Sequence, residues 1–557
     1  MKIGYCIFFL LVYTTTFSQI EDAWVYLKDK PNPETYLNNP LTMLTQRALD
    51  RRIAQNIALD ILDVPISESY IEAIALSAGI TVKAKSKWLN CLHVRGTIAA
   101  INALKAMSFV SGIDFADTNL NTNTNRFGAI KKSELQTRTP DINKIILSEK
   151  EAEKSILYDY GNAANQIEML NGHVLHQLNY TGSGKIIAVL DSGFPGVNTL
   201  QPFERLRTNN QILGGYNYVG ESSNFYTGDS HGTTVLSFMG GYKEGQLIGT
   251  APDAKYYLFI TEDALSAFPY NENPVEESNW VEAAEEADRL GVDIITTSLG
   301  YFGYDNSNYS HTYSDMTGNK AFASRGANIA FNKGIVVLAS AGNEGGKTEP
   351  HIGVPAEALN VIAVGAVRSD RTYASFSSIG PSYDNRMKPD IMAQGENPYF
   401  SDTSGNIVNY GSGTSYSCPI LAGMIACLMQ ALPNKTAQEI KQVVTQSSDR
   451  FLNPTYQFGY GIPDFNLALS QGLSTTTFLD SNCFVYPNPT SDSVAITLPS
   501  KSSFGSIKIY TLLGQSVLEN TISNQQTTVS LKSLEKGIYF YKLELDGFLK
   551  RGKIIKH

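Results

Sequence analysis

Short apolar runs separated by helical stretches fill residues 157–472, and they limit what this part of the chain can fold into. The runs lack the alternation of a half-exposed strand, so each is expected to be a strand buried on both faces. Residues 281–290 and 320–332 between them have the pattern of helices. This alternation predicts an α/β fold with a doubly wound parallel sheet. The expected strands are residues 186–190, 256–260, 294–295, 335–338 and 361–364.

Two polar residues follow expected strands at the end where sites form in such sheets. Asp191 directly follows residues 186–190, and Asn343 comes shortly after residues 335–338. A carboxylate where an apolar strand ends is costly as a core residue, so Asp191 either caps a turn or serves a site. Asn343 is either a turn residue in the left-handed conformation or a side-chain amide donor.

The stretch Gly413-Thr414-Ser415-Tyr416-Ser417-Cys418-Pro419 runs directly into the apolar residues 420–429. We expect Gly413 to make a tight turn and Pro419 to lie in the first turn of a buried helix, which places Ser415 at its start. The unpaired N–H groups and partial positive charge of a helix start stabilise an oxygen that gains negative charge. Serine is also a favoured helix cap, so Ser415 is a candidate nucleophile only if a base and an orienting acid lie close to it.

The base has one candidate among the seven histidines of the chain. Only His231, in Ser230-His231-Gly232-Thr233, begins an apolar helical run that could carry an imidazole into the same cleft. A lone histidine is more often a surface or core residue, but its neighbours here favour a site.

Taken in order, these motifs resemble those of the subtilisin-like serine proteases (subtilases). Each motif is common by itself, and the ordered set is specific. The succession Asp, His, Ser also differs from that of chymotrypsin and of the α/β-hydrolases. The resemblance covers residues 160–465 and rests on Asp191-Ser192-Gly193, His231-Gly232-Thr233, Gly249-Thr250-Ala251-Pro252, Ser298-Leu299-Gly300, Ala341-Gly342-Asn343, Ala374-Ser375-Phe376-Ser377, Lys388-Pro389-Asp390-Ile391 and Gly413-Thr414-Ser415 with Pro419.

The resemblance implies a role for each of these site residues. Ser415 would be the nucleophile and His231 the base and then the acid, while Asp191 would orient the imidazole. Asn343 would donate a hydrogen bond to the oxyanion. Ser298, Leu299 and Gly300 would pair with the extended substrate backbone. Ser340, Ala341 and Gly342 would line the pocket for the residue before the cut, and Gly353 at its base would leave room for a large side chain.

This chain departs from the family pattern beside the nucleophile. Most members have methionine and alanine there, whereas this chain has Tyr416 and Ser417, followed by Cys418. We expect these changes to alter packing and substrate fit, not the chemistry. The chemistry requires no cofactor. Residues 198–228 do not follow the family's usual calcium loop, so metal ligands are unknown and a structural calcium ion has no matched ligands.

The N-terminal part, residues 19–117, is expected to be a separate α+β domain. Its order of strand, helix, strand, strand, helix, strand is that of a ferredoxin-like split βαβ sandwich. An additional amphipathic helix carries Arg47, Arg51 and Arg52, which we interpret as a solvated face. The domain resembles a subtilase propeptide, an intramolecular inhibitor that would leave after cleavage in the linker 118–155.

The two ends of the chain indicate export. Residues 1–18 have the single positive charge, short apolar core and small residues of a secretory signal peptide. After the peptidase domain, expected over residues 156–472, residues 473–557 alternate like a small β-sandwich. This last segment resembles a type IX secretion sorting domain. The resemblance implies a protein that the type IX machinery carries across the outer membrane and that is then secreted or attached to the cell surface. The motifs are Val485-Tyr486-Pro487-Asn488-Pro489, Leu534-Glu535-Lys536-Gly537 and Gly552-Lys553-Ile554-Ile555.

Charge and cysteine content narrow the range of partners. The net charge of −9 argues against nucleic acid and anionic membrane, because both need a basic surface. No segment after the signal peptide is expected to span a membrane. Cys6 belongs to the signal peptide, and the other four cysteines, Cys91, Cys418, Cys427 and Cys483, are too scattered to imply a disulfide framework.

The sequence therefore predicts a serine-type endopeptidase, made as a zymogen, that hydrolyses protein or peptide substrates through an acyl-enzyme. Hydrolysis is expected to fall as His231 becomes protonated on the acid side of neutrality. Two alternatives stay open at this stage. One is a surface-binding protein that keeps the fold without catalysis, and the presence of all four catalytic residues argues against it. The other is an esterase or lipase, which would need a Gly-x-Ser-x-Gly elbow, whereas residues 413–417 end in serine.

Overall fold

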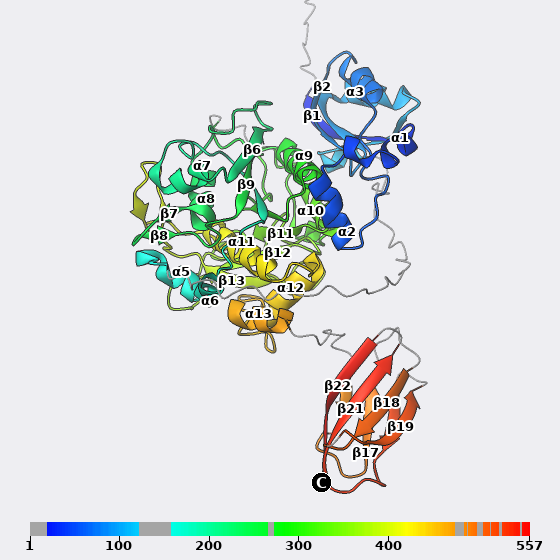
Figure 1. Ribbon diagram of the computed structural model, residues 1–557. Coiled ribbons are helices and arrows are strands. Elements are labelled where there is room, and N and C mark those ends of the chain that lie inside the picture. Colours follow the sequence, from blue (N-terminus) through cyan, green and yellow to red (C-terminus); the bar gives the residue numbers. More distant parts are fainter. Residues whose placement is uncertain are drawn as a thin grey trace, which may run out of the picture. The chain divides into compact units, whose positions relative to one another are not determined.

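The structure is a computed structural model in which the chain divides into two units, Met1–Gln471 and Gly472–His557 (Figure 1). The expected signal peptide, 1–18, and most of the expected linker, 118–155, lie outside the described residues. The structure describes residues 19–121, 158–265, 272–473, 484–486, 488–497, 505–512, 514–522, 526–545 and 548–557.

A seven-stranded sheet forms the middle of the first unit. All neighbouring strands are parallel, in the order β13-β12-β11-β10-β5-β9-β6. β5 comes first in the sequence, and the later strands lie on both sides of it in the sheet. The strand order therefore reverses beside β5, where such sheets bind ligands. The strands are β5 (Ile186–Asp191), β6 (Ile212–Asn217), β9 (Lys255–Ile260), β10 (Ile294–Thr297), β11 (Val336–Ser340), β12 (Ile362–Val367) and β13 (Ile391–Gln394).

The predicted doubly wound sheet is confirmed, and all five expected strands are present. The two edge strands, β6 and β13, were not predicted. β6 contains two glycines and is half-buried along its length, and β13 has only four residues. Neither has the long apolar run that marks a strand buried on both faces.

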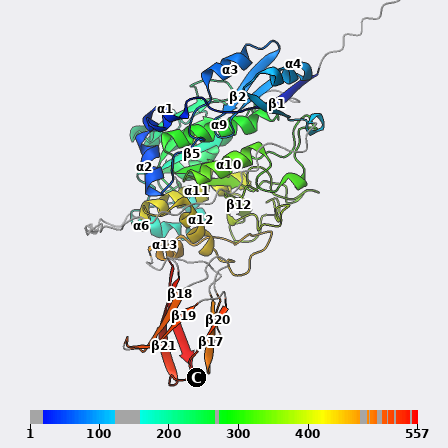
Figure 2. The same ribbon diagram turned by 90° about the vertical axis from the view of Figure 1, so that its right-hand side faces the viewer.

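Helices cover both faces of the sheet. α9 (Val275–Leu290) and α10 (Phe322–Asn332) pack against each other. α8 (His231–Gly240) and α11 (Thr414–Ala431) form a second pair. In Figure 2, α9 lies above β5 and α11 below it. The predicted helices over 281–290 and 320–332 are therefore present, although α9 begins earlier than expected.

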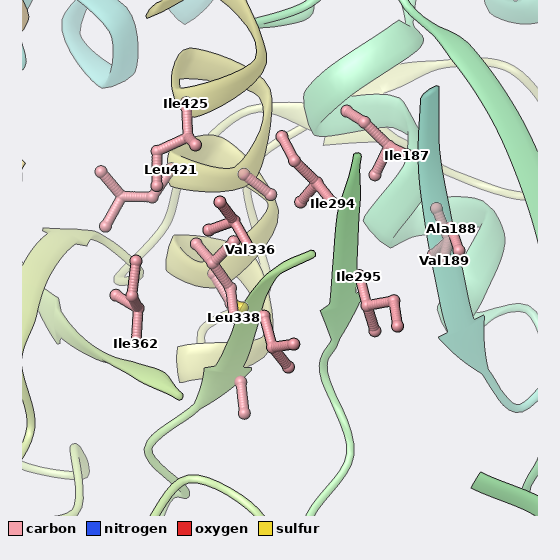
Figure 3. Close-up of a cluster of buried hydrophobic side chains, with 14 of the residues drawn as sticks. Ile187, Ala188, Val189, Ile294, Ile295, Val336, Leu338, Ile362, Leu421 and Ile425 are labelled. Carbon is pink, nitrogen blue, oxygen red and sulfur yellow. The ribbon is translucent and has the colours of Figure 1, made fainter. Parts of the chain in front are cut away.

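The apolar helix α11 is the centre of the core. It packs against β10, β11, β12 and β13 and is buried along most of its length. Figure 3 shows Leu421 and Ile425 of α11 close to Val336, Leu338 and Ile362 of the strands. We expected no further segment with the length and apolar character of a membrane span, but α11 has both. Its burial is that of a core helix.

Shorter elements complete the part of the first unit after residue 158. They lie before β5, between β5 and β9, or after β13. They are the helices α5 (Ala164–Glu168), α6 (Gly172–Gln177), α7 (Glu204–Thr208), α12 (Ala437–Gln446) and α13 (Phe465–Leu473), with the paired short strands β7 (Tyr242–Lys243), β8 (Leu247–Ile248), β14 (Phe400–Ser401) and β15 (Ile407–Val408).

The N-terminal part of the first unit is an antiparallel sheet in the order β2-β3-β1-β4. The predicted succession of strand, helix, strand, strand, helix, strand is confirmed, with helices α1 and α2 inserted after the first strand. The elements are β1 (Ile20–Leu27), α1 (Pro33–Leu37), α2 (Gln46–Ala54), α3 (Glu68–Ala75), β2 (Ile80–Ser86), β3 (Cys91–Thr97), α4 (Ile98–Ala103) and β4 (Val110–Phe115).

The arginines of α2 do not form the solvated face that the sequence suggested. Arg51 and Arg52 are buried, and both donate hydrogen bonds to the buried carboxylate of Asp288 in α9. Arg47 is partly exposed and pairs with Asp293. The amphipathic pattern was read correctly, but the charged face packs against carboxylates that are distant in the sequence.

The second unit contains two antiparallel sheets, β16-β17-β20 and β19-β18-β21-β22. Their apolar side chains share one core, which confirms the predicted small β-sandwich. The strands are β16 (Phe484–Tyr486), β17 (Ser493–Thr497), β18 (Gly505–Tyr510), β19 (Ser516–Ile522), β20 (Gln526–Ser530), β21 (Gly537–Leu545) and β22 (Phe548–Lys556).

The close approach of α11 to the turn before β9 gives a stability prediction. A Cβ atom at Gly423 would lie 2.0 Å from Thr250 Oγ1 and 3.2 Å from Ala251 N. Gly423→Ala should therefore overpack the core and lower the free energy of unfolding by about 1–3 kcal/mol. Thermal unfolding in a Ser415→Ala background measures this, with Gly303→Ala as control because no atom lies within 4 Å of that added Cβ. Equal unfolding midpoints for the two variants would contradict the prediction.

Candidate active site

The carboxyl end of β5 and the start of α8 bring Asp191 and His231 into contact. His231 Nδ1 lies 2.7 Å from Asp191 Oδ1, which also accepts the backbone N–H of Ser192 at 2.8 Å. The helix can approach the strand because Gly232 has no side chain. A Cβ atom there would lie 2.9 Å from Asp191 Cβ and 2.4 Å from Gly193 O. Asp191 therefore both caps a turn and orients an imidazole.

The electrostatics of this pair decide the protonation of His231. Asp191 is fully buried, and the side chain of His231 is 30% exposed. Burial lowers the pKa of His231, but the charge and hydrogen bond of Asp191, with the charges of Glu262 and Asp229, raise this pKa to about 9. Because Asp191 holds the proton on Nδ1, Nε2 is the nitrogen that gains and loses a proton. His231 is therefore a proton carrier that deprotonates in the alkaline range.

Ser415 lies in the first turn of α11, as predicted, but two details of this helix start differ. α11 begins at Thr414, so Pro419 lies inside the helix and not in its first turn. Gly413 is extended, with φ 172° and ψ 155°, and therefore makes no tight turn.

The position of Pro419 explains a contact of Ser298. Proline has no N–H, so the carbonyl four residues earlier, that of Ser415, loses its partner within the helix. Ser298 Oγ donates to this carbonyl at 2.9 Å. Ser298 comes directly after β10. Its hydroxyl therefore ties the first turn of α11 to the carboxyl end of the sheet.

Thr414 fixes the orientation of the Asn343 amide. Asn343 Oδ1 accepts the backbone N–H of Thr414 at 2.9 Å and its hydroxyl at 3.1 Å. Because the amide oxygen is occupied in this way, the NH₂ group is left to donate elsewhere. Asn343 does not adopt the left-handed conformation, so the interpretation as a left-handed turn residue is wrong.

Gly413 leaves an open space in which the hydroxyl of Ser415 and the amide of Asn343 meet. The position of the missing Gly413 Cβ is 3.5 Å from Ser415 Oγ, 3.6 Å from Asn343 Nδ2 and 3.6 Å from the backbone nitrogen of Ser415. An atom in this space could therefore contact a hydroxyl and two N–H donors together. Any side chain at position 413 would occupy it.

The remaining site residues follow the same strand ends. Ser340 ends β11, and the next two residues, Ala341 and Gly342, lead to Asn343. The backbone N–H of Gly342 donates to Thr414 Oγ1 at 3.1 Å. Leu299 and Gly300 follow Ser298, and a bridge between Tyr301 and Val354 joins this segment to Gly353. A Cβ atom at Gly353 would lie 3.4 Å from Tyr301 O.

Three contributors to the site were missed at the sequence level. Thr414 was noticed only as part of a motif, although it orients Asn343. Asp229 accepts the backbone N–H of His231 at 2.8 Å and raises the pKa of that residue. Glu262 acts on His231 through its charge. Asp229 lies two residues before His231, where a helix-capping acid could have been suspected. No sequence pattern marked Glu262.

The residue after Ser415 packs among aromatic rings. The Tyr416 ring lies 5.1 Å from that of Phe238 and 5.3 Å from that of Phe400, centre to centre. Cys418 is buried and unpaired, as are Cys91 and Cys427. Within the described residues, no group of three or more His, Cys, Asp or Glu side chains could hold a metal ion.

Comparison with known families assigns three segments of the chain. Residues 182–461 match the sequence profile of the Subtilase family. Residues 22–133 match the Peptidase S8 propeptide domain of Bacteroidota, and residues 484–557 match a Secretion system C-terminal sorting domain.

Two curated relatives are subtilisins, in agreement with the Subtilase match. Subtilisin NAT of Bacillus subtilis subsp. natto is 30% identical over 316 residues, which cover 56% of this chain and 72% of the relative. Subtilisin of Bacillus pumilus is 30% identical over 301 residues, covering 53% and 94%. A solved structure of the MycP3 protease from the type VII (ESX-3) secretion system aligns with a TM-score of 0.44 at 21% identity, covering 57% of this chain and 93% of that one.

The contact between Asp191 and His231 can be tested by titration. Asp191→Asn removes the main negative charge near the imidazole while burial still acts, so the pKa of His231 should fall well below about 9. NMR titration of His231 in a Ser415→Ala background measures this pKa. Asp370→Asn, at an exposed carboxylate, is the control and should leave it unchanged. The same His231 pKa in both variants would contradict the assigned contact.

Proposed function

The chain belongs to the subtilase family, and on that premise we propose that it is a secreted serine endopeptidase, made as a zymogen, that cuts peptide bonds through an acyl-enzyme. It is a serine-type peptidase with an S8 propeptide domain and a C-terminal sorting domain. The sorting domain indicates export, followed by secretion or attachment to the cell surface.

The proposed division of the chain follows these segments. A signal peptide, 1–18, directs export and is removed. The propeptide, 19–117, and linker, 118–155, precede the peptidase domain, 156–472. The sorting domain, 473–557, passes the protein to the type IX machinery for transport across the outer membrane. The expected partners are protein or peptide substrates and the chain's own propeptide.

The proposed reaction uses Ser415 as the nucleophile. His231 Nε2 takes the proton of Ser415 Oγ as this oxygen attacks the substrate carbonyl carbon. His231 then gives the proton to the leaving amine, and the C–N bond breaks to leave an acyl-enzyme. A water molecule, deprotonated by His231, cleaves the ester and restores the hydroxyl. Asp191 keeps the imidazole in the required tautomer throughout.

The space in front of Gly413 is the observation that carries this proposal. Ser415 Oγ, the backbone N–H of Ser415 and Asn343 Nδ2 all border it within 3.6 Å. A carbonyl group placed there would have a nucleophile beside its carbon and two donors for its oxygen. Loss of such a side-chain donor typically costs about 10²–10³ in turnover. Thr414 contributes by keeping the amide of Asn343 in the donating orientation.

The substrate would lie between the loop that contains Tyr301 and the loop that contains Val354. A β-bridge between these two residues connects the loops. We propose that Ser298, Leu299 and Gly300 pair with the extended substrate backbone. Ser340, Ala341 and Gly342 form the wall of the pocket for the residue before the cut. The missing side chain of Gly353 leaves space at its base. Ser298 has the additional task of holding the carbonyl of Ser415.

Covalent labelling tests the nucleophile. The processed protein should react with a fluorophosphonate probe at Ser415 and hydrolyse peptides, and Ser415→Ala should lose both properties. Ser412→Ala, at an exposed serine of the same loop, is the matched control and should keep both. Mass spectrometry of the labelled peptide locates the adduct. Equal labelling of wild type and Ser415→Ala would show that the nucleophile is wrongly assigned, and a protein that neither labels nor hydrolyses would remove the enzyme reading.

The pKa of His231 sets the pH dependence of hydrolysis. Protonated His231 cannot accept the proton of Ser415, so kcat/KM should rise with pH and reach half its maximum near the pKa of about 9. This differs from the fall on the acid side of neutrality that the sequence suggested, because the surrounding carboxylates raise the pKa.

Asp229→Asn tests the cause of that pH dependence. The substitution keeps an acceptor for the His231 N–H but removes a charge that raises the pKa, so the midpoint should move to lower pH. Asp370→Asn should not move it. A wild-type midpoint at or below about pH 7, or no shift in Asp229→Asn, would refute the electrostatic explanation.

A further inference from the structure

The propeptide contacts the peptidase domain at two separate places. The first is its sheet, in which Trp24 of β1 and His93 of β3 contact Ser278 of α9 and β2 lies along the same helix. Glu285 accepts hydrogen bonds from Ser86 Oγ at 2.7 Å, Lys87 N at 3.0 Å and Trp88 N at 2.9 Å. Glu282 accepts one from Lys85 N at 3.1 Å. The second place is α2, which lies beside the C-terminal end of α9 (Figure 1).

α2 and the residue before it cap the end of α9. The last carbonyls of a helix have no partner within it, and they favour a positive charge. Thr45 N donates to Arg289 O at 2.9 Å, and Arg47 Nε donates to Gly291 O at 2.9 Å. Arg51 donates to Val292 O just beyond the helix. The propeptide therefore supplies hydrogen bonds to this helix end and adds cationic charge to that of Arg289 in its last turn.

A buried network of charged side chains from both domains lies beside this helix end. Asp288 of α9 accepts from Arg51 and, at 2.7 Å, from Arg52. Arg52 also pairs with Asp63 of the propeptide at 3.0 Å, and Asp63 pairs with Lys333 of the peptidase domain at 3.0 Å. All five side chains are buried. Charges alternate through the network, so each buried carboxylate has two cationic partners.

The α2 contact also reaches the ends of two other helices. Gln55, which follows α2, donates through Nε2 to Gly334 O at 2.8 Å, just after α10. Its Oε1 accepts from Ala437 N at 3.0 Å, the first residue of α12. One amide therefore satisfies a carbonyl after α10 and an unpaired N–H at the start of α12.

We propose that α2 and the segment up to Asp63 form a second anchor, which holds the propeptide on the peptidase domain after the linker has been cut and sets the rate of its release. The anchor binds the C-terminal ends of α9 and α10 and the start of α12, apart from the sheet contact at the middle of α9. This proposal rests on the proposed inhibitory role of the propeptide. Cutting the linker alone would then leave the inhibitor in place, and activation would wait until the anchor is lost.

The test uses the full chain with Ser415→Ala, so that it does not process itself. A recognition sequence for a site-specific protease is placed within residues 122–157, and the chain is cut there. The readout is the rate at which the tagged propeptide fragment leaves the remainder after dilution, followed by size-exclusion chromatography. With the anchor intact, the two fragments should stay together.

Arg52→Met is the decisive variant. It removes one partner from two buried carboxylates, so release should become at least about 100-fold faster. Gln55→Ala loses two hydrogen bonds at the edge of the anchor and should speed release by about 10-fold. Asp50→Ala is the matched control, because Asp50 is an exposed residue of the same helix whose side chain accepts only from Gln46 within α2. It should leave the rate unchanged.

Each outcome decides the proposal. Release at the control rate in Arg52→Met overturns it, as does immediate separation of the unmodified chain after the linker is cut. If Arg52→Met does not fold, Gln55→Ala alone decides, and release at the Asp50→Ala rate refutes the anchor. Because no hydrolysis is measured, failure of the proposed peptidase activity would leave these rates unaffected. Conversely, a failed anchor would not alter the labelling of Ser415.

Discussion

The packing of α11 against the parallel sheet is the constraint on which the rest of the site depends. Nearly every side chain from Ser417 to Met429 is buried, so the helix cannot slide or rotate without losing close-packed contacts. Its first turn is thereby fixed at the carboxyl ends of β10 and β11. Two residues from these strand ends then join it, Ser298 through the carbonyl of Ser415 and Asn343 through the N–H of Thr414. The packing of the core therefore determines the geometry of the candidate nucleophile.

Two buried carboxylates of the peptidase domain are compensated in different ways. Asp191 has the imidazole of His231, which belongs to the same domain and stays when the propeptide leaves. Asp288 has Arg51 and Arg52, which both belong to the propeptide. Removing the partners of a buried charge costs far more than an exposed pair contributes. On the proposed release of the propeptide, the site would keep its arrangement, whereas the end of α9 would need new partners or solvent.

Features that depend on local sequence patterns were predicted correctly. Features that depend on residues distant in the sequence were not. Buried runs predicted five strands of the sheet, and the order of motifs placed Asp191, His231 and Ser415 at strand ends and helix starts. The face of α2 was misread because Asp288, its partner, lies more than two hundred residues away and no local pattern connects them. The upward shift in the pKa of His231 was not anticipated for the same reason. It comes from Asp191 at the end of β5 and then from Glu262, which follows β9, against the effect of burial. Pro419 was placed one turn too early because the carbonyl that it leaves without a partner, that of Ser415, is satisfied by Ser298, which follows β10.

The sequence of α9 reflects its contacts with the propeptide that covers it. A helix on the surface of a sheet normally has one apolar face and one solvated face. In α9 the acidic residues do not all face solvent. Glu285 receives three donors from residues 86–88, and Asp288 receives two arginines. The carboxylates on this face therefore serve as acceptors for backbone N–H groups and guanidinium groups of the propeptide. Without that domain, Glu282, Glu285 and Asp288 would lose these donors, while the one arginine of α9, Arg289, pairs with Glu286. Mutual repulsion and the loss of hydrogen bonds then favour rebinding of a basic, N–H-rich surface over an apolar one. Recognition of the propeptide thus depends on charge and hydrogen bonding along this helix.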